Sequence, residues 1–420
     1  MNSVKKYFRN KLSPNLWTSL TQIRKKLSQV RSKVFQFFSA IEDLYFYILF
    51  FMRKKKGFTS VACLVPFMRL EFAASGKVCP CCVVFTKVKS VGNMKDESIE
   101  QIWNGKALQR FRKLLLLGVT RKTCMPKCKY LKTGPISIDD IRTDTEDGAL
   151  IHDDIRNGRV KLLSHPIRFN LANFTVCNLN CVMCTTRRLK QRNDDIPLHV
   201  IKTHENLKDY FDKKVTIYLS GNGDVLARKD TRELLQNFDS KKHNKVSFQI
   251  ITNGLLFQPE MWETIKHNNY TYANISLDAA TKETYAKVRR GANWEKLMSA
   301  LEVFRKAKEE GKFSSVNLNM TTMRSNYREI PQFIKMARSM GFHVLLTIIR
   351  GEWGDENIFE LNDEKELQEL RTILSDRSLY GKDVDMIGLL QYIPKEFHSL
   401  MGNNLSSIWL PTSILKTKEN

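Results

Sequence analysis

Apolar and polar positions follow a regular order in the second half of the chain, where short strand-like runs alternate with helical periods. Strands that alternate with helices are typical of repeated βα units around a parallel sheet, so the predicted fold class is α/β. We expect strands at Ile167–Thr175, Val215–Ser220, Val246–Thr252, Tyr272–Leu277, Ser315–Thr321 and His343–Ile349. We expect helices between them at Pro197–Tyr210, Thr231–Asp239, Pro259–His267, Trp294–Glu310 and Tyr327–Met340.

Near the beginning of the chain, apolar residues recur with a helical period from Val34 to Met52, and a basic run, Arg53–Lys56, follows. Glu42 and Asp43 interrupt this stretch, whereas a membrane-spanning helix needs about 20 consecutive apolar residues. We therefore do not expect it to span a membrane. Two interpretations remain open: the apolar face lies in the interface of a membrane, or it packs against the protein's own core or a partner.

The remaining pattern suggests five regions. A basic amphipathic helical extension covers residues 1–57. A small α+β module covers residues 58–135, with strands at Leu64–Phe72 and Val78–Val88 and a helix at Ile99–Leu117. Residues 136–164 are acidic and only weakly periodic, so we expect a linker. The βα units fill residues 165–350, and residues 351–420 form an extension with a charged helix at Leu361–Leu374.

The charge and the cysteines narrow the function. The net charge is +24, and residues 1–57 contribute +11 of it through thirteen Lys or Arg and two acidic residues. A basic chain favours anionic partners such as phosphates, acidic lipid or nucleic acid. All nine cysteines lie between Cys63 and Cys184. An odd number in short spacings, without a cleavable secretory signal, indicates a reducing cytosol.

The most informative motif is the segment Cys177–Cys184, which places three cysteines within eight residues directly after the first predicted strand of the βα units. Thiolates are soft ligands that suit zinc or iron–sulfur clusters. A structural zinc site normally has a fourth Cys or His, whereas a catalytic metal keeps one position open. His165 and His199 are the nearest histidines, and neither lies in the motif. A zinc site or buried thiols remain the alternative interpretation.

The spacing Cys177, Cys181, Cys184 resembles the signature of the radical S-adenosylmethionine (radical SAM) enzymes. The resemblance implies that these three cysteines hold a [4Fe–4S] cluster whose fourth iron binds S-adenosylmethionine. It also implies an open (β/α)6 barrel for residues 165–350. One-electron reduction would then yield a 5′-deoxyadenosyl radical, which abstracts hydrogen from a substrate. The protein's part in such chemistry is to bind, orient and exclude water.

Further segments match the same family at the carboxyl ends of the predicted strands, where ligands bind in such sheets. Gly221–Asp224 corresponds to a glycine-rich loop that takes the amino group of S-adenosylmethionine, although Asn222, Asp224 and Val225 depart from the usual residues. The resemblance implies contacts with this cofactor from the following residues: Met183, whose backbone would flank adenine, Gly221, Asn222, Gly223, Asp224, Asn253, Ser276 and Arg290.

The module at 58–135 resembles the SPASM/twitch domains, which bind auxiliary iron–sulfur clusters. The resemblance rests on the spacing of Cys63, Gly76 and Cys81, on the pair Cys124 and Cys128, and on Ile102-Trp103-Asn104. It implies that these four cysteines hold an auxiliary [4Fe–4S] cluster. Cys79 or Cys82 could replace Cys81, and a structural zinc knuckle is the alternative. In most relatives this domain follows the core, whereas here it precedes it.

These observations predict a cytoplasmic radical SAM enzyme that abstracts hydrogen from a C–H bond, with flavodoxin or ferredoxin as electron donor. By analogy, the substrate is a peptide or protein side chain; the alternative is a sugar or nucleotide-linked small molecule near the inner face of a membrane. Residues 1–57 could contact an anionic membrane surface there. We do not expect nucleic acid as a partner, although a non-catalytic iron–sulfur module that binds nucleic acid or a protein is a different class of explanation.

Overall fold

The computed structural model describes residues 41, 44–82, 87–88, 90–126, 128, 134–172, 175–184, 196–219, 223–351, 353–402 and 414–415. The chain divides into two compact units, Met1–Phe58 and Thr59–Asn420. In the first unit, residues 44–56 are helical, as the period of the apolar residues predicts. The second unit contains all nine cysteines and all the predicted strands.

Six parallel strands form the centre of the second unit, in chain order and each hydrogen-bonded to the next. This arrangement confirms the predicted α/β class and the parallel sheet of a partial barrel. One strand has its predicted bounds, and the others differ by a few residues at their ends. The strands are β6 (Arg168–Ala172), β7 (Val215–Leu219), β8 (Val246–Thr252), β9 (Tyr270–Ser276), β10 (Ser315–Thr322) and β11 (His343–Ile348).

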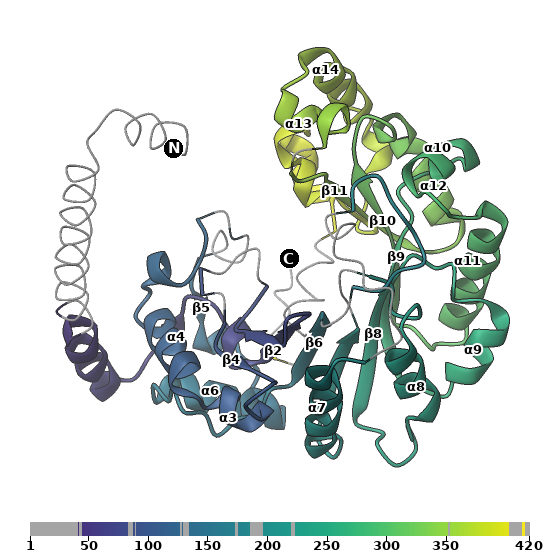
Figure 1. The fold of residues 1–420 in the computed structure, drawn as a ribbon. Helices are drawn as coiled ribbons and strands as arrows, with labels where there is room; N and C mark the ends of the chain where they lie inside the picture. Colours follow the sequence, from purple (N-terminus) through teal and green to yellow (C-terminus); the bar gives the residue numbers. More distant parts are fainter. Residues whose placement is uncertain are drawn as a thin grey trace, which may run out of the picture. The chain divides into compact units, whose positions relative to one another are not determined.

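Helices connect these strands, and Figure 1 shows α8, α9, α11 and α12 on the outer side of the sheet. Several begin at a side chain that accepts a backbone N–H, such as Thr281 before α10 and Asn293 before α11. The short α10 adds a helix to the five predicted ones. The helices are α7 (Leu198–Leu207), α8 (Lys229–Asn237), α9 (Pro259–Ile265), α10 (Lys282–Val288), α11 (Trp294–Glu309) and α12 (Ile330–Ser339).

The two faces of this sheet differ in chemistry because side chains alternate along a strand. One face carries fully buried apolar residues, and the helices cover it: Ile217, Phe248, Ile250, Ala273, Ile275, Val316, Leu318, Val344 and Leu346. The intervening residues occupy the other, concave face and are mostly polar: Arg168, Asn170, Tyr218, Gln249, Tyr272, Asn274, Asn317 and Asn319. A polar inner face is suited to surround a polar molecule.

The small module joins the same sheet. β2 (Arg69–Ala73) pairs in parallel with β6, and β3 (Lys77–Cys79) and β4 (Gly92–Asn93) continue the sheet in antiparallel order. At the opposite edge, β12 (Val384–Asp385) pairs with β11, which completes a ten-stranded sheet. A separate two-stranded sheet consists of β1 (Ser60–Val61) and β5 (Ile136–Ser137).

Within this module the predicted helix Ile99–Leu117 is two helices, α3 (Ile99–Trp103) and α4 (Lys106–Leu116). Asn104 and Gly105 separate them, because Gly105 has extended backbone angles and a Cβ there would lie 2.8 Å from the carbonyl oxygen of Gln101. The predicted strand at Leu64–Phe72 is also shorter, since Val65–Phe67 form the 3-10 helix η1 before β2 begins. Pro66 removes a backbone donor there and favours the helical turn.

Residues 136–164, expected to be a linker, are folded. They contain the 3-10 helix η3 (Ile138–Asp140) and helix α6 (Glu146–Arg156), whose first turn is capped by the Thr145 side chain. Asp154 is fully buried, and its carboxylate accepts hydrogen bonds from the backbone N–H groups of Leu163 and Ser164. The acidic composition suggested a solvated linker, but the Asp154 carboxylate stabilises the turn that contains Leu163 and Ser164.

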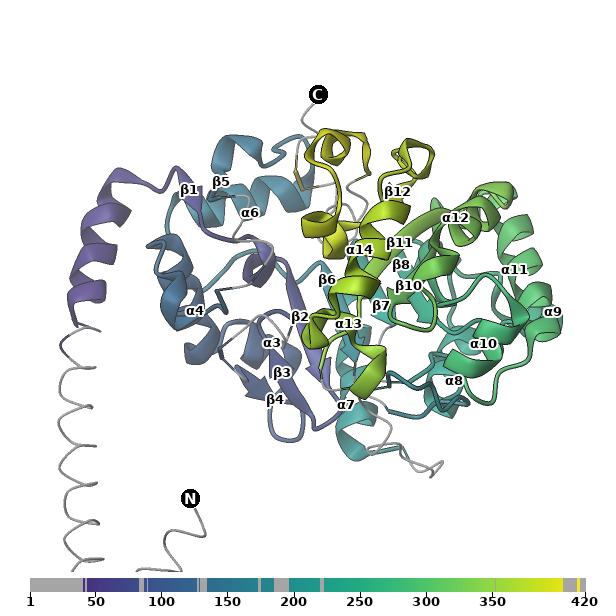
Figure 2. The same cartoon turned by 90° about the horizontal axis from the view of Figure 1, so that it is seen from above.

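The described part of the carboxyl-terminal extension packs beside β10 and β11 (Figure 2). The predicted charged helix at Leu361–Leu374 begins only at α14 (Glu364–Ile373), because Asn362 has a φ of +50° and ends α13 (Ile358–Leu361). Glu369 of α14 accepts a hydrogen bond from the Tyr327 hydroxyl at 2.7 Å. Shorter 3-10 turns complete the region: η6 (Gly354–Glu356), η7 (Arg377–Leu379), η8 (Ile387–Tyr392) and η9 (Lys395–Leu400).

Arg112 on α4 connects the parts of the small module. It is fully buried, and its guanidinium donates to the carbonyl oxygens of Pro66 at 2.9 Å, Trp103 at 2.7 Å and Val160 at 3.0 Å. It also stacks on the Trp103 ring at 4.1 Å. Burial lowers the pKa of Arg112 to about 9, and the nearby Asp154 acts in the opposite direction.

We predict that Arg112→Met lowers the free energy of unfolding by about 3 kcal/mol, because three buried carbonyl oxygens lose their donor. Equilibrium unfolding in urea measures this change. Arg110→Met on the exposed side of the same helix is the control, with an expected effect within about 0.5 kcal/mol. Equal stability of the two variants would contradict the role assigned to Arg112.

Candidate active site

The cysteine loop follows β6 at the carboxyl edge of the sheet, where all the predicted site residues of the barrel were expected. Hydrogen bonds from the Asn180 N–H to the Arg290 carbonyl and from the Val182 N–H to the Val288 carbonyl, both 3.0 Å, attach the loop to the end of α10. The side chains of Val182 and Met183 pack against a buried apolar cluster of Val288, Met323 and Ile349. The loop is thus held against β10 and β11 as well as following β6.

Asp224 lies after β7 and is fully buried. Its carboxylate accepts hydrogen bonds from the Thr252 hydroxyl at 2.8 Å, the Asn253 N–H at 2.7 Å and the Leu226 N–H at 3.0 Å. Burial raises the pKa of Asp224, and these hydrogen bonds act against the increase. In this structure the carboxylate therefore joins the ends of β7 and β8, rather than pointing toward a ligand.

Gly223 explains why the loop after β7 can lie so close to the cysteine loop. A Cβ at Gly223 would lie 2.0 Å from the carbonyl oxygen of Val176, so only glycine allows the β7 loop to lie against the cysteine loop. The Asp224 N–H donates to the same carbonyl at 2.9 Å. Gly221 and Asn222, the other predicted residues of this loop, lie outside the described residues.

Asn253, at the end of β8, connects that strand to the cysteine loop. Its side-chain amide donates to the Asn178 side chain at 2.8 Å and approaches the Cys177 sulfur at 3.8 Å. The Cys177 sulfur also accepts the Leu179 N–H at 3.4 Å. N–H donors directed at a cysteine sulfur stabilise its thiolate, the form that binds iron.

A buried ion pair reaches the second cysteine of the loop. Asp278 has a φ of +63° and pairs with Arg289 at 2.5 Å, and both side chains are less than a tenth exposed. The other guanidinium nitrogen of Arg289 lies 3.9 Å from the Cys181 sulfur. Burial disfavours the charge of Arg289, yet Asp278 and Cys181 keep the pKa of this guanidinium above its ordinary value. A permanent positive charge therefore faces Cys181.

The remaining predicted residues occupy the same edge in different ways. Ser276 is half-buried at the end of β9, and Arg290 is exposed, although its backbone carbonyl holds the cysteine loop. It is Arg289, one residue before the predicted Arg290, whose side chain contacts the loop. Cys177, Cys181 and Cys184 are all partly exposed.

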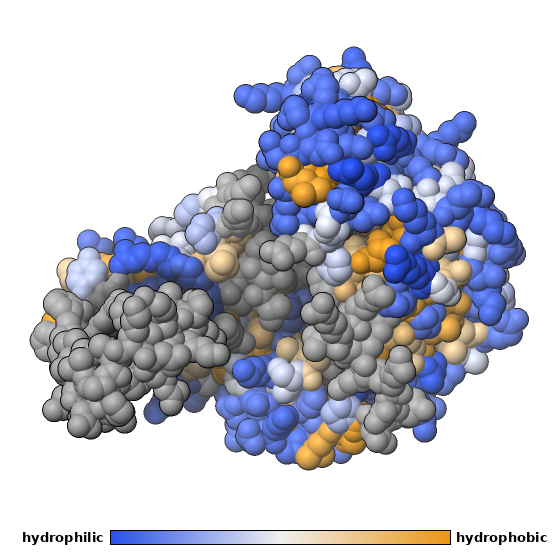
Figure 3. Space-filling model, turned by 45° about the horizontal axis from the view of Figure 1, so that its top comes forward, coloured by the Kyte–Doolittle hydropathy of each residue, from blue (hydrophilic) through white to orange (hydrophobic). Residues whose placement is uncertain are grey.

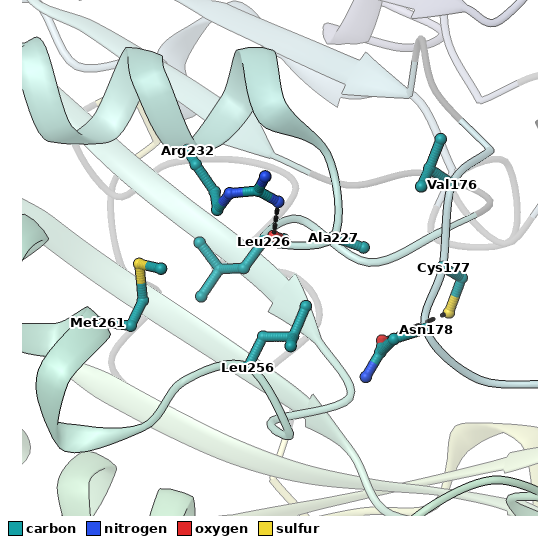
Figure 4. Close-up of a pocket in the computed structure, with 8 residues that line it drawn as sticks. All are labelled: Val176, Cys177, Asn178, Leu226, Ala227, Arg232, Leu256 and Met261. Carbon is teal, nitrogen blue, oxygen red and sulfur yellow. Dashed lines mark hydrogen bonds between the residues drawn. The ribbon is translucent and has the colours of Figure 1, made fainter. Parts of the chain in front are cut away.

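A cavity of about 410 Å³ lies against Cys177, and Figure 4 shows its lining. Leu226, Leu256 and Met261 provide apolar walls, and Arg232 of α8 donates to the Leu226 carbonyl at 2.7 Å. Cys177 and Asn178 form the opposite wall. Its volume falls in the range of small-molecule sites, and Cys177, one of the three predicted cluster ligands, lines it.

The cysteines of the small module fall into two groups. Burial raises the pKa of Cys63 to about 12, and the Cys124 and Cys128 thiols add to this increase. Burial likewise raises the pKa of Cys81, with contributions from Cys63 and Cys124. These four predicted ligands are therefore close enough to influence one another electrostatically.

The other two cysteines of the module are Cys79 and Cys82. Burial also raises the pKa of Cys79, with Glu71 and Cys82 as further contributors. Glu71 also contributes to the raised pKa of Cys81, so the same carboxylate acts on both cysteines. Cys79, Cys81 and Cys82 therefore all stay candidates for the fourth ligand of the auxiliary site.

The donor sets fit iron–sulfur clusters in number and chemistry: three thiols in one loop of the barrel and four in the module. Among the described residues, no three His, Cys, Asp or Glu side chains are gathered closely enough to hold a single metal ion. A cluster offers a separate iron to each thiolate, so its ligands are spaced more widely than those of one zinc ion.

Comparison with known proteins decides between the remaining interpretations. The model of the radical SAM superfamily matches residues 174–337, and that of the SPASM iron–sulfur cluster-binding domain matches residues 63–130. Residues 174–337 belong to the radical SAM superfamily. The cofactors of this radical SAM protein are therefore a [4Fe–4S] cluster and S-adenosylmethionine. Its SPASM domain, which is amino-terminal here, binds auxiliary iron–sulfur clusters.

Its relatives have diverse names. The AdoMet-dependent heme synthase of Methanosarcina barkeri is 29% identical over 43% of this chain and 50% of its own. The mycofactocin maturase MftC of Mycobacterium tuberculosis is 26% identical over 41% of this chain and 42% of its own. The solved structure of Streptococcus suis SuiB bound to precursor peptide SuiA is 16% identical over 67% of this chain and 64% of its own, with a TM-score of 0.40, too low to argue from. The matched part of the radical SAM chain spans about half the length of the two curated relatives.

Sequence reasoning missed Arg289 and Asn178 of the radical SAM site, although both lie next to predicted residues. The two consecutive arginines Arg289 and Arg290 indicated that one of them contacts the site. The end of helix α10 determines that it is the side chain of Arg289 that points toward the cysteine loop. For Asn178, the signal was its position beside Cys177. In both cases the side chain's direction depends on tertiary contacts that a linear pattern does not contain.

We predict that Asp278→Asn lowers the free energy of unfolding by about 3 kcal/mol, since it leaves the charge of Arg289 buried without its partner. Asn suits the positive φ of this position, so the change removes mainly the charge. The double variant Asp278→Asn/Arg289→Met should be more stable than Asp278→Asn alone. Urea unfolding of both variants measures this coupling.

The control is Glu295→Gln, which removes a fully exposed ion pair with Lys282 on neighbouring helices. It should leave the free energy of unfolding nearly unchanged, because solvent screens an exposed pair. A double variant less stable than Asp278→Asn would show that the Arg289 charge is not the cause of the loss.

Proposed function

We propose that this protein reductively cleaves S-adenosylmethionine and abstracts hydrogen from a C–H bond of a peptide or protein side chain. The observation that carries the first part is the loop at Cys177–Cys184, which offers three thiols at the carboxyl edge of the barrel and is fixed from both sides. Cys177, Cys181 and Cys184 hold the catalytic cluster, and Cys63, Cys81, Cys124 and Cys128 hold the auxiliary one. A cluster with three protein ligands keeps one iron for the cofactor.

When bound and reduced by one electron, the cluster would pass that electron to the sulfonium of S-adenosylmethionine, and cleavage of a C–S bond would give methionine and a 5′-deoxyadenosyl radical. The chain's own residues orient and protect this reaction. Arg289 holds a positive charge beside Cys181, and Asn253 directs its amide toward Cys177. The apolar cluster beneath Val182 and Met183 excludes water on one side of the loop. Reduced flavodoxin or ferredoxin is the proposed electron donor.

The concave face supports a substrate that contains amide groups. Asn274 and Asn317 are directly opposite each other on β9 and β10, and both are more than nine-tenths buried. Among the residues that the structure describes, neither Oδ1 of Asn274 nor Nδ2 of Asn317 has a hydrogen-bond partner. One is an acceptor and the other a donor, which is the complement of an amide N–H and C=O. Because unpaired buried polar groups are costly, a ligand with an amide would stabilise this pair.

We predict that the anaerobically reconstituted protein binds about eight irons per chain, as two [4Fe–4S] clusters. With dithionite and S-adenosylmethionine it should form 5′-deoxyadenosine. The triple variant Cys177→Ala/Cys181→Ala/Cys184→Ala should keep about four irons and form none. Stoichiometric zinc in place of iron, or no cleavage by the wild type, would leave a non-catalytic metal module.

We predict that Asn317→Leu lowers kcat/KM toward a substrate peptide at least about tenfold, because the amide loses its donor in a buried site. The formation of 5′-deoxyadenosine without substrate should not change. The probes are deuterated synthetic peptides, and transfer of deuterium from the peptide to 5′-deoxyadenosine measures the reaction.

The matched control is Thr322→Val, since Thr322 also has a buried unpaired hydroxyl but lies on the opposite face of β10 by the alternation of the strand. It should leave kcat/KM unchanged. Deuterium transfer from nucleotide sugars instead of peptides would favour the second substrate class. In that case the effect of Asn317→Leu on kcat/KM would no longer report recognition of a peptide amide.

A further inference from the structure

The helix at residues 44–56 exposes its apolar residues. Among the described residues, twelve large hydrophobic side chains are exposed. One of them, Ile41, lies just before this helix, and six belong to it: Leu44, Tyr45, Tyr47, Ile48, Phe51 and Met52. Their exposed fractions range from 46% to 63%. In contrast, the surface in Figure 3 shows hydrophobic residues in small separate groups among hydrophilic ones.

These side chains share one side of the helix. At 100° per residue, Leu44, Ile48, Phe51 and Met52 fall within a single face, at spacings of three and four residues. The opposite side is different, since Phe46 and Phe50 are buried and the Phe50 ring lies 5.6 Å from the Phe58 ring. The helix therefore buries two phenylalanines on one side and exposes a larger apolar face on the other.

A basic run follows this face directly. Arg53, Lys54, Lys55 and Lys56 are exposed, and Lys55 follows Phe51 by four residues on the same side. Tyrosines beside aliphatic residues, with lysines at the end, are the composition of helices that lie at a lipid surface. Long lysine side chains can reach the headgroups while their methylene groups remain in the apolar layer.

No helix in the described part of the chain is long and apolar enough to cross a membrane. A helix of this kind would instead lie parallel to the surface, with its apolar face at the boundary of headgroups and acyl chains. A second copy of the chain is a poorer occupant, because residues 1–57 carry a net charge of +11 that would repel its own copy.

We infer that the helix at 44–56 binds the surface of an anionic lipid bilayer through its exposed apolar face and the lysines that follow it. Both features contribute in different ways. The apolar side chains supply the burial, and the lysines supply attraction to negative headgroups, which weakens as salt increases. The iron–sulfur sites and the barrel take no part in this contact, so it is independent of the proposed function.

The test is sedimentation of the full-length, reconstituted protein with vesicles of phosphatidylcholine and phosphatidylglycerol. Binding should be strong with these vesicles, weak with phosphatidylcholine alone, and reduced by salt. Ile48→Glu/Met52→Glu should weaken binding at least about tenfold, because two buried side chains lose their apolar contact. Lys54→Gln/Lys55→Gln/Lys56→Gln should weaken it by about fivefold per lysine at low salt.

The matched control is Leu163→Glu/Leu198→Glu, which adds the same charge at two equally exposed leucines of the second unit. It should bind the vesicles as the wild type does. Equal binding by Ile48→Glu/Met52→Glu would overturn the inference. So would two other results for that variant: a lowered melting temperature, which would mean that the face packs on the chain itself, or a shift from dimer to monomer in light scattering.

Discussion

Two buried carboxylates determine how the cysteine loop is held. Asp224 joins the end of β7 to the end of β8, and through Asn253 this junction reaches Cys177. Asp278 joins the end of β9 to β10 through the Thr321 N–H at 2.6 Å, and through Arg289 it reaches Cys181. A buried carboxylate is costly unless it is hydrogen-bonded or paired, and each of these two satisfies that requirement with groups of the site.

In this arrangement, different groups position the cysteine loop and face a ligand. Both carboxylates are occupied within the protein, and sulfur, amide and backbone groups are among those left to face a ligand. The concave face continues this chemistry with Asn274 and Asn317 on its central strands. Charge is therefore used to position the loop, whereas neutral donors and acceptors are available to recognise what enters the barrel.

Much of this fold could be predicted from the sequence. The period of two in Val246–Thr252 and the helical period in Trp294–Glu309 are long enough to identify the elements and nearly all their bounds. The cysteine spacing indicated two sets of thiols, whose roles as cluster ligands stay predictions. Prediction failed where one residue overrides a pattern: Gly105 divides a helix, Asn362 ends another, and Thr145 and Asp154 order a segment whose acidity suggested a linker. Arg289 was missed because its direction depends on Asp278, which is eleven residues away in the chain.

The pairing of β2 with β6 has a further consequence for the stability of the protein in solution. The first strand of a half-open barrel would otherwise present five residues of unpaired backbone at its edge, a template for aggregation with other chains. Because the small module adds three strands there, the edge becomes β4, and at the opposite end it is β12, each only two residues long. The module that contributes four thiols therefore also protects the sheet from association.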